Sequence, residues 1–325
     1  MRMKGVFGLI ALTCVLGAPL PARAEAIKVD KSIKPYTKAG DVSGNLNSIG
    51  SDTLNNLMTL WAEAFQKQYA GVKIQIEGKG SSTAPPALIA GTAQLGPMSR
   101  LMKPEETDGF EKQYGYKPTP IRVAVDGLAV FVNKDNPLKE LTMPQVDAIF
   151  SKTRKGGAAE DITTWGQVGL TGTWAAKPIS LYGRNSASGT YGYFKEHALY
   201  KGDYKDTVKE QPGSAAVVQG ITADKFAIGY SGIGYKTSDV KSLKLAAKDG
   251  GEFVSDEAEN VYSGKYPLAR FLYIYVNEAP GKPLAPLVKQ FLEFVLSKDG
   301  QEIVIKDGYL PLLGRHVAEE LPKLK

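Results

Sequence analysis

Three short loops rich in glycine, serine and threonine carry the residues of this sequence that are best suited to chemistry. They cover residues 47–53, 78–83 and 183–190, and each lies between a strand-like and a helix-like segment. The first turn of a helix presents unpaired N–H groups and a partial positive charge. Glycine lets the backbone approach a ligand closely, and hydroxyl groups add donors without bulk. The pattern therefore predicts a site for a small anion where the loops converge.

Each loop taken alone has a simpler explanation. Serine and threonine are preferred N-cap residues, so capping accounts for most single loops of this kind. Arg184 favours the anion interpretation, because a guanidinium can direct two N–H groups at a tetrahedral oxyanion. It stands just before Ser188, Gly189 and Thr190. The alternative is a surface arginine paired with a carboxylate. Arg100 is a second candidate of the same kind.

The segments around these loops alternate between strand-like and helix-like patterns, which predicts an α/β fold with helix-covered sheets. We expect strands over residues 46–49, 72–76, 94–96, 122–133, 179–182, 227–230, 243–246 and 271–277. We expect helices over residues 54–69, 84–90, 103–114, 142–150, 191–199, 214–221, 284–296 and 300–306. Residues 25–44 are polar and read as a loose arm.

Two long apolar strands, 122–133 and 271–277, bracket the middle of the chain. The simplest arrangement has the chain leave one domain at the first strand and return at the second. Domain I is then residues 25–124 and 272–325, and domain II is residues 125–271. Two crossing strands form a hinge, and the cleft between the domains is where a ligand would bind.

The first 24 residues have the pattern of a secretory signal peptide. Arg2 and Lys4 make a basic start, residues 6–20 are mostly apolar, and Ala22–Ala24 fits a small-x-small cleavage site. We expect cleavage after Ala24 and export to a bacterial periplasm. The alternative is a lipid anchor at Cys14, the only cysteine of the chain. Cleavage after Ala24 leaves a mature chain without thiol or disulfide chemistry.

Charge and composition exclude several functions. The chain has 325 residues and a net charge of +6, which falls to +3 once the three basic residues of the signal are removed. This mild surplus, without a basic run interleaved with aromatics, argues against nucleic-acid binding. No later apolar stretch is long enough to span a membrane. Only His197 and His316 are available as imidazole bases, and no HExxH, GxSxG or P-loop occurs. We expect no enzyme activity, no metal and no cofactor.

Seven motifs resemble the phosphate-binding protein family of bacterial ABC phosphate importers, in family order and over almost all of the mature chain. They are SIGSDTL (48–54), GKGSSTAPPAL (78–88), LGPMSR (95–100), VDGLAVFVNKDNP (125–137), LTMPQVDAIF (141–150), GRNSASGTYGYF (183–194) and IGYSGIGY (228–235). The resemblance implies a type II periplasmic-binding-protein fold, in which two α/β domains joined by two crossovers close around one dehydrated phosphate. It also implies a membrane permease as partner, and we expect a monomer.

The resemblance carries over to individual residues. It implies that phosphate contacts Thr53, with Ser51 and the amide of Leu54 beside it. Ser81 corresponds to the hydroxyl donor of the second loop, with Ser82 as its neighbour. From the other domain it implies contacts by four residues, namely Arg184, Ser188, Gly189 and Thr190.

The chain departs from the family pattern at Ser99 and Ser186. Some members carry at the first position an aspartate that accepts the proton of monohydrogen phosphate and excludes sulfate, since an acceptor left unpaired rejects a fully ionised analogue. Others carry Ser-Arg, as here. Asp126 is our first candidate for a replacement acceptor and Asp52 the second. The alternative is structural, with Asp52 as a helix cap and Asp126 as a partner for Arg184 or Arg100. Family members often carry an acidic residue just after the arginine that corresponds to Arg184, whereas this chain has Ser186.

Three other functions stay open on the sequence. The first is a binding protein of the same class whose ligand is sulfate or molybdate. The second is a secreted hydrolase of phosphate esters. The third is an adhesion role, in which exposed tyrosines would form an interface. Tyr191, Tyr193, Tyr230 and Tyr235 are the residues concerned, although such aromatics more often pack in a core or a hinge.

Overall fold

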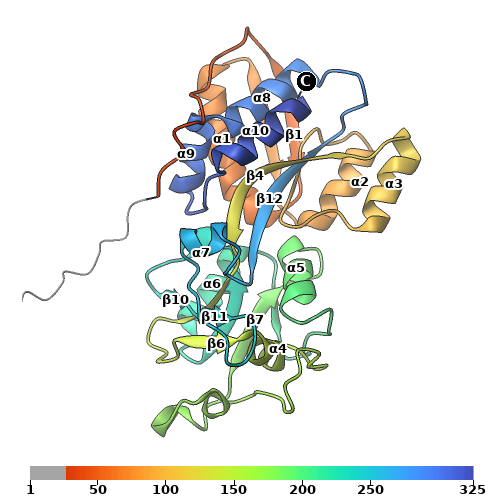
Figure 1. Cartoon of the computed structure of the whole chain (residues 1–325). Coiled ribbons are helices and arrows are strands. Elements are labelled where there is room, and N and C mark those ends of the chain that lie inside the picture. Colours follow the sequence, from red (N-terminus) through yellow and green to blue (C-terminus); the bar gives the residue numbers. More distant parts are fainter. Residues whose placement is uncertain (1–26, 325) are drawn as a thin grey trace, which may run out of the picture.

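The structure is a computed structural model that describes residues 27–324. Two lobes are joined by β4 (Thr119–Gly127) and β12 (Ala269–Val276), which lie side by side and run from one lobe to the other (Figure 1). We call the lobe that holds both chain ends lobe I and the other lobe II. The predicted signal peptide lies outside the described residues. The domain boundaries at 124/125 and 271/272 stay a prediction.

Lobe I is built on a mixed sheet. Strand β1 (Gly44–Ile49) pairs in parallel with β2 (Val72–Glu77), and β12 lies between β4 and β3 (Gly96–Met98). A single parallel bridge from Ser48 to Leu95 joins the two groups of strands. Six helices belong to this lobe, namely α1 (Asn55–Gln68), α2 (Ala84–Ile89), α3 (Pro104–Tyr114), α8 (Pro286–Leu296), α9 (Lys298–Lys306) and α10 (Gly314–Glu320).

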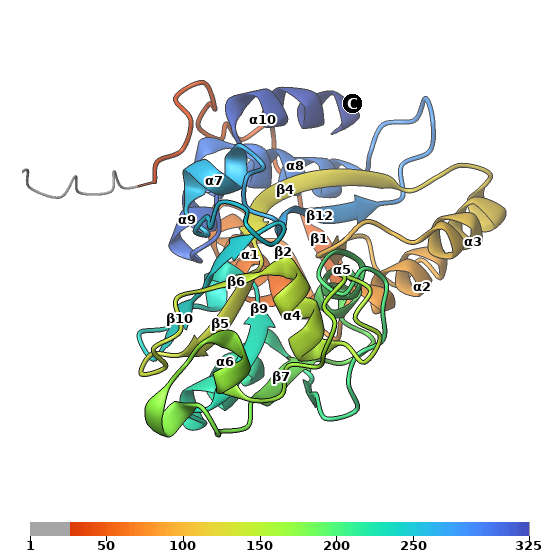
Figure 2. The ribbon, with the colours of Figure 1, turned by 60° about the horizontal axis from the view of Figure 1, so that its bottom comes forward.

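Lobe II holds a five-stranded sheet in the order β10-β5-β9-β7-β8, and its helices lie around that sheet (Figure 2). These strands are β5 (Ala129–Asn133), β7 (Ser180–Arg184), β8 (Lys209–Gln211), β9 (Ala227–Ser231) and β10 (Val240–Ser242). A short parallel pair is formed by β6 (Glu140–Thr142) and β11 (Lys244–Ala246). The helices are α4 (Met143–Phe150), α5 (Gly189–His197), α6 (Ser214–Ala223) and α7 (Ala258–Tyr262). Within residues 27–324, every helix is too short or too polar to cross a membrane.

The core of lobe I holds helix α1 against α8 and α9. Trp61, Phe65 and Phe291 are fully buried, and the rings of the two phenylalanines meet edge to face at 5.4 Å. The indole N–H of Trp61 donates to the carbonyl of Gly300 over 2.9 Å, which satisfies the one polar group that this side chain buries. This packing fixes α1, and with it the loop that precedes the helix.

The predicted strand–loop–helix units are confirmed at all three loops. Strand β1 leads through a 3-10 turn (Asp52–Leu54) into α1, and β2 leads through another (Ser81–Thr83) into α2. Strand β7 leads through the loop of residues 185–188 into α5. Because β1 and β2 are parallel neighbours, their carboxyl ends lie at the same edge of the sheet, and the first two loops are therefore adjacent.

The prediction of one continuous strand over 122–133 was wrong. The segment divides at Leu128 into β4 and β5, which belong to different sheets. The Leu128 N–H donates to the carbonyl of Leu268, so this residue sits where both chain crossings meet. Both halves are buried and apolar, and hydrophobicity alone does not reveal a change of sheet.

Several short elements were not predicted, and the N-terminal arm is better packed than expected. Ile33 is buried, and Tyr36 packs edge to face against Phe294. The strand expected at 94–96 is β3, two residues later. The strands β6, β8 and β10 have three residues each and α7 has five, so these elements are too short to show a periodic sequence pattern. Helix α10 buries only Val317 and Glu320, so its sequence shows no apolar face.

Asp307 gives a testable consequence of this fold. Burial raises the pKa of its carboxyl from 3.8 to about 6, and the hydrogen bond from Asn56 opposes that shift. Asp307 also follows the last residue of α9, where a helix disfavours negative charge. The native state binds this proton more tightly than the unfolded chain does. The contribution of Asp307 to stability is therefore fully present below about pH 4 and is lost as the pH rises through about 6.

We predict that Asp307→Asn raises the free energy of unfolding at pH 7 by about 1 to 2 kcal/mol and flattens its pH dependence between about 4 and 6. Urea denaturation at a series of pH values measures both effects. Asp206→Asn is the control, since Asp206 is 90% exposed and pairs only with Lys152. If Asp307→Asn had the same pH dependence of stability as the parent protein, the raised pKa of Asp307 would be contradicted.

Candidate functional site

Four buried hydroxyl groups from both lobes meet at the junction between them. The Oγ1 atoms of Thr53 and Thr190 lie 2.8 Å apart. The Oγ of Ser99 lies 3.3 Å from that of Ser81 and 3.4 Å from the Oγ1 of Thr190. Each of these four residues is at most 1% exposed. We call Thr53, Ser81, Ser99 and Thr190 the hydroxyl cluster.

Local structure holds each hydroxyl in place. Thr53 and Ser81 lie in the 3-10 turns before α1 and α2, and Thr190 lies in the first turn of α5. Ser188 caps α5, because its Oγ accepts from the N–H groups of Thr190 and Tyr191. Three helix N-termini therefore meet at the hydroxyl cluster. Their amides and partial positive charges make it an environment suited to an anion.

Gly189 is present because nothing larger fits. A Cβ at this position would lie 2.2 Å from the Oγ of Ser81 and 2.7 Å from the Oγ of Ser99. The backbone of α5 therefore reaches into the hydroxyl cluster of lobe I, which a side chain would prevent.

The backbones of the two lobes also touch beside the cluster. The Ser82 N–H donates to the carbonyl of Ala187 over 3.1 Å. Gly80 has φ +122°, and a Cβ there would lie 2.4 Å from the same carbonyl oxygen. The second loop of lobe I and the loop before α5 in lobe II are thus in direct contact, as the convergence prediction requires.

Arg184 is buried and is held by partners from both lobes. Its Nη1 donates to the Oγ of Ser214 over 2.7 Å, and its Nη2 donates to the carbonyl of Pro212 and lies 3.3 Å from Oδ2 of Asp52. Burial lowers the pKa of the Arg184 guanidinium, and the Asp52 carboxylate opposes that shift. Among the described residues, its buried Nε has no hydrogen-bond acceptor.

Asp52 supplies the acid that the sequence lacks at Ser186. Its Oδ2 accepts from the N–H of Ser214, the first residue of α6, over 2.7 Å. It therefore acts at a helix N-terminus, as the structural alternative proposed, but the helix belongs to the opposite lobe. It also contributes to holding Arg184, so the guanidinium has an acidic partner despite the departure from the family pattern.

Arg100 is paired with a carboxylate, which is the alternative considered for a surface arginine. Its guanidinium forms two hydrogen bonds of 2.7 Å with the carboxylate of Glu106, and its Nη2 also donates to the Oγ of Ser82 over 3.2 Å. It lines a cavity of about 420 Å³ at the junction of the lobes, together with Ser186 and Lys195. The structure thus places Arg100 beside the second loop, with its charge paired.

Asp126 is paired with an arginine that the sequence analysis did not single out. Its Oδ2 accepts from Nε and Nη2 of Arg270 over 2.9 and 2.7 Å, and its Oδ1 accepts from the Ile233 N–H over 2.9 Å. The structural alternative named Arg184 or Arg100 as the partner of Asp126, whereas the structure pairs it with Arg270. Both carboxylate oxygens are engaged, which favours the structural alternative for Asp126 over the role of proton acceptor.

The remaining predicted residues lie in the same region. Ser51 precedes the first 3-10 turn and is 2% exposed, with its N–H bonded to the carbonyl of Pro97. Leu54 is fully buried at the end of that turn. Tyr235 donates its hydroxyl to the carbonyl of Asp52, and Tyr230 stacks on Phe194 at 3.9 Å. Tyr230 is fully buried, and Tyr235 is half-buried with its hydroxyl bonded inside the molecule.

The two histidines serve packing. The ring of His197 lies 4.1 Å from that of Tyr193, and the ring of His316 meets Phe271 edge to face at 5.1 Å. Burial lowers the pKa of both imidazoles. Neither arrangement is that of a base poised beside a nucleophile.

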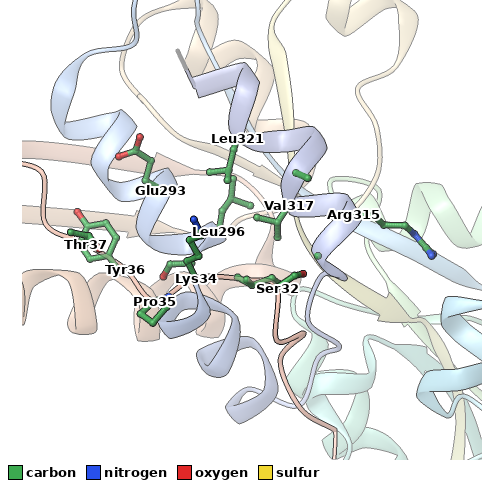
Figure 3. Close-up of a pocket in the computed structure, with 14 residues that line it drawn as sticks. Ser32, Lys34, Pro35, Tyr36, Thr37, Glu293, Leu296, Arg315, Val317 and Leu321 are labelled. Carbon is green, nitrogen blue, oxygen red and sulfur yellow. The ribbon is translucent and has the colours of Figure 1, made fainter.

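A groove of about 780 Å³ lies elsewhere, on lobe I. It is bounded by residues 32–37, by α8 and by α10 (Figure 3). Leu296, Val317 and Leu321 give it an apolar floor, and Lys34, Glu293 and Arg315 stand at its rim. It shares no residue with the hydroxyl cluster.

Comparisons with known proteins show the family of this chain. Residues 37–299 match the model of the PBP superfamily domain. The chain is 59% identical over 323 residues to the phosphate-binding protein PstS of Pseudomonas aeruginosa, with 99% of each chain covered. It is 30% identical to the phosphate-binding protein PstS of Staphylococcus epidermidis over 80% of this chain and 77% of that protein.

Solved structures share the fold. A putative phosphate ABC transporter substrate-binding protein from Clostridium perfringens, with bound phosphate, superposes with a TM-score of 0.70 at 27% identity, covering 83% of this chain and all of the other. An ABC-type phosphate transport receptor from Vibrio cholerae gives a TM-score of 0.63 at 23% identity, covering 82% and 100%. The predicted periplasmic-binding-protein fold is confirmed. The chain belongs to the PBP superfamily and, within it, to the family of PstS phosphate-binding proteins.

Proposed function

We propose that this chain captures inorganic phosphate in the periplasm and delivers it to the membrane permease of an ABC-type phosphate importer. The observation that carries the proposal is the hydroxyl cluster, in which groups from two lobes meet at three helix N-termini. The PstS relatives are named for phosphate binding, and the Clostridium perfringens structure contains bound phosphate. Both support the same ligand here. The relatives are named as binding proteins rather than as enzymes.

Hydrogen-bond donors are what the bound ion requires. A buried dianion that loses its hydration shell costs several kcal/mol or more unless donors replace the water. Hydroxyls of Thr53, Ser81 and Thr190 and the amides of the 3-10 and α5 turns supply such donors. The buried Nε–H of Arg184 is a further donor that a bound oxyanion would satisfy.

The charges near the site balance one another. Arg184 lies against Asp52, and Arg270 is bonded to Asp126. A site of this kind binds an anion mainly through directed hydrogen bonds and helix termini rather than through a net positive charge. Of the two carboxylates considered as acceptor for the phosphate proton, we favour Asp52, because both oxygens of Asp126 already accept hydrogen bonds.

Closure of the lobes would couple ligand binding to the relative arrangement of the two lobes. Donors come from both lobes, so a bound ion stabilises the arrangement in which they converge, and the permease would recognise that arrangement. We propose that the ligand contacts are Ser51, Thr53, Leu54, Ser81, Ser82, Ser99, Arg184, Ser188, Gly189 and Thr190, with Asp52 as the acceptor of the phosphate proton. We also propose that the mature protein begins after Ala24, works in the periplasm and is a monomer.

Two alternatives have weaker support. A binding protein for sulfate or molybdate would use the same donors and differ in its acceptor. A hydrolase of phosphate esters would need a base beside a nucleophile, whereas both histidines are packed against aromatic rings. The experiment that separates these functions is a binding titration of the purified protein with several oxyanions, together with a chromogenic ester assay.

We predict that phosphate and arsenate bind, and that sulfate at neutral pH competes at least about a hundredfold more weakly, because a site with an acceptor for the ligand proton leaves that acceptor unpaired with sulfate. Isothermal calorimetry with competing anions measures this ratio. Equal affinities for phosphate and sulfate would contradict a phosphate-specific site and favour a binding protein for another oxyanion.

We predict that Arg184→Ala weakens phosphate binding by at least about 2 kcal/mol, because charge-assisted hydrogen bonds are lost and Asp52 is left unpaired. Calorimetry measures the affinity, and a thermal melt confirms that the variant is folded. Arg154→Ala is the matched control, since Arg154 lies on the same lobe and pairs with the exposed Asp161. Unchanged affinity in Arg184→Ala would remove this residue from the site.

We predict that Gly189→Ala weakens phosphate binding at least about tenfold, because its Cβ would overlap the Oγ atoms of Ser81 and Ser99 and hold the lobes apart. Calorimetry and small-angle X-ray scattering follow affinity and compaction. Gly192→Ala on the same helix is the control, since its Cβ would approach nothing closer than the Arg100 side chain at 3.4 Å. Equal behaviour of the two variants would contradict the close approach at Gly189.

A further inference from the structure

Arg270 is a buried cation directly behind the hydroxyl cluster. It lies on β12 opposite Asp126 on β4, and its side chain is 3% exposed. Its Nη2 donates to the Oγ1 of Thr190 over 3.0 Å, and its Nη1 donates to the carbonyl of Ser99 over 2.8 Å. The guanidinium also lies over the ring of Tyr193 at 5.1 Å. One side chain therefore touches Ser99 in lobe I and Thr190 in lobe II, both members of the cluster.

The hydrogen bond to Thr190 decides the direction of that hydroxyl. A hydroxyl group carries a single hydrogen and can act as donor or acceptor. A guanidinium can only donate, so Thr190 accepts from Arg270 and its own hydrogen must be donated elsewhere. The nearest partner is the Oγ1 of Thr53 at 2.8 Å, inside the cluster. A hydroxyl that accepts from a cation is also a stronger donor, because hydrogen bonds in a chain polarise one another.

Asp126 holds the guanidinium in this orientation. Two of its hydrogen bonds come from Arg270, and the third comes from the Ile233 N–H of lobe II. The Arg270 head group thus has four hydrogen bonds, two to the carboxylate and one each to Ser99 and Thr190. In this arrangement of the lobes the network therefore joins Ser99 of lobe I to Ile233 and Thr190 of lobe II.

We propose that Arg270 is a positioning residue of the anion site, which fixes the Thr190 hydroxyl as a donor and holds α5 in register with the Ser99 loop. The role rests on the proposed function, since the donor serves the bound oxyanion. The guanidinium acts through Thr190 and needs no contact with the ligand. Its charge is compensated by Asp126, which explains how a second buried arginine is accommodated beside Arg184.

The test is a double-mutant cycle on phosphate binding. Asp126→Asn/Arg270→Gln removes both charges together, so no uncompensated charge is buried. We expect the affinity of this variant to fall about tenfold or more, as for the loss of a hydrogen bond from a charged donor. In a Thr190→Val background the same change should alter the affinity by less than about twofold, because the hydroxyl through which Arg270 acts is gone.

Arg122 provides the matched control. Like Asp126, it lies on β4, and it is paired with the buried Glu320 of α10. Arg122→Gln/Glu320→Gln should lower the melting temperature and leave phosphate affinity within about twofold, since sites without shared partners are additive. An equal loss of affinity in this control would show that weakening the hinge is enough, and would overturn the role of Arg270.

Two further outcomes are decisive. A tenfold loss that persists undiminished in the Thr190→Val background overturns the proposal, as does an unchanged affinity in Asp126→Asn/Arg270→Gln. If that variant fails to fold, Asp126→Leu/Arg270→Met replaces it, because apolar pairs of similar volume often preserve folding. The unmodified protein is titrated first. Failure of that protein to bind phosphate contradicts the proposed function, whereas a binding parent with an undiminished loss contradicts only the role of Arg270.

Discussion

The pairing of β4 with β12 is the constraint on which the rest of the structure depends. These strands come from distant parts of the chain, yet their ladder runs from Thr119 opposite Val276 to Gly127 opposite Ala269. Strand β3 lies on the other side of β12, and Ser99 follows it directly. One ladder therefore joins the lobes, sets Arg270 opposite Asp126 and places a member of the hydroxyl cluster. A shift of its register by one residue would turn these side chains to the opposite face.

The site illustrates how a protein buries charge without accumulating it. Two arginines and two aspartates lie within it, each cation against one carboxylate, and each pair shares hydrogen bonds with backbone groups. Such pairing limits the desolvation cost of each ion. The contacts proposed for a ligand are hydroxyls and amides, and Arg270 donates to one of these hydroxyls, that of Thr190. At the proposed site, selectivity would depend on hydrogen-bond geometry, which is more specific than attraction between charges.

The sequence predicted the parts of this site that are local. A strand, a loop of small polar residues and a helix form one continuous segment, so the positions of Thr53, Ser81 and Thr190 at helix N-termini were readable. Arg270 was missed because it appears as a single arginine at the start of an apolar strand. Its meaning depends on register with Asp126, 144 residues away. The change of sheet at Leu128 escaped prediction for the same reason, since both flanking strands are equally apolar.

The backbone contact between Ser82 and Ala187 has a consequence for how related chains can diverge. Where lobes meet through an amide and a carbonyl, most substitutions leave the contact unchanged, and only the conformation of Gly80 is strictly required. Exchanges among serine, threonine and other small residues in the hydroxyl cluster can then change ligand preference without changing the outline, that is, the outer surface of the closed form. Transport machinery fitted to that outline would accept proteins of differing ligand affinity without having to change alongside them.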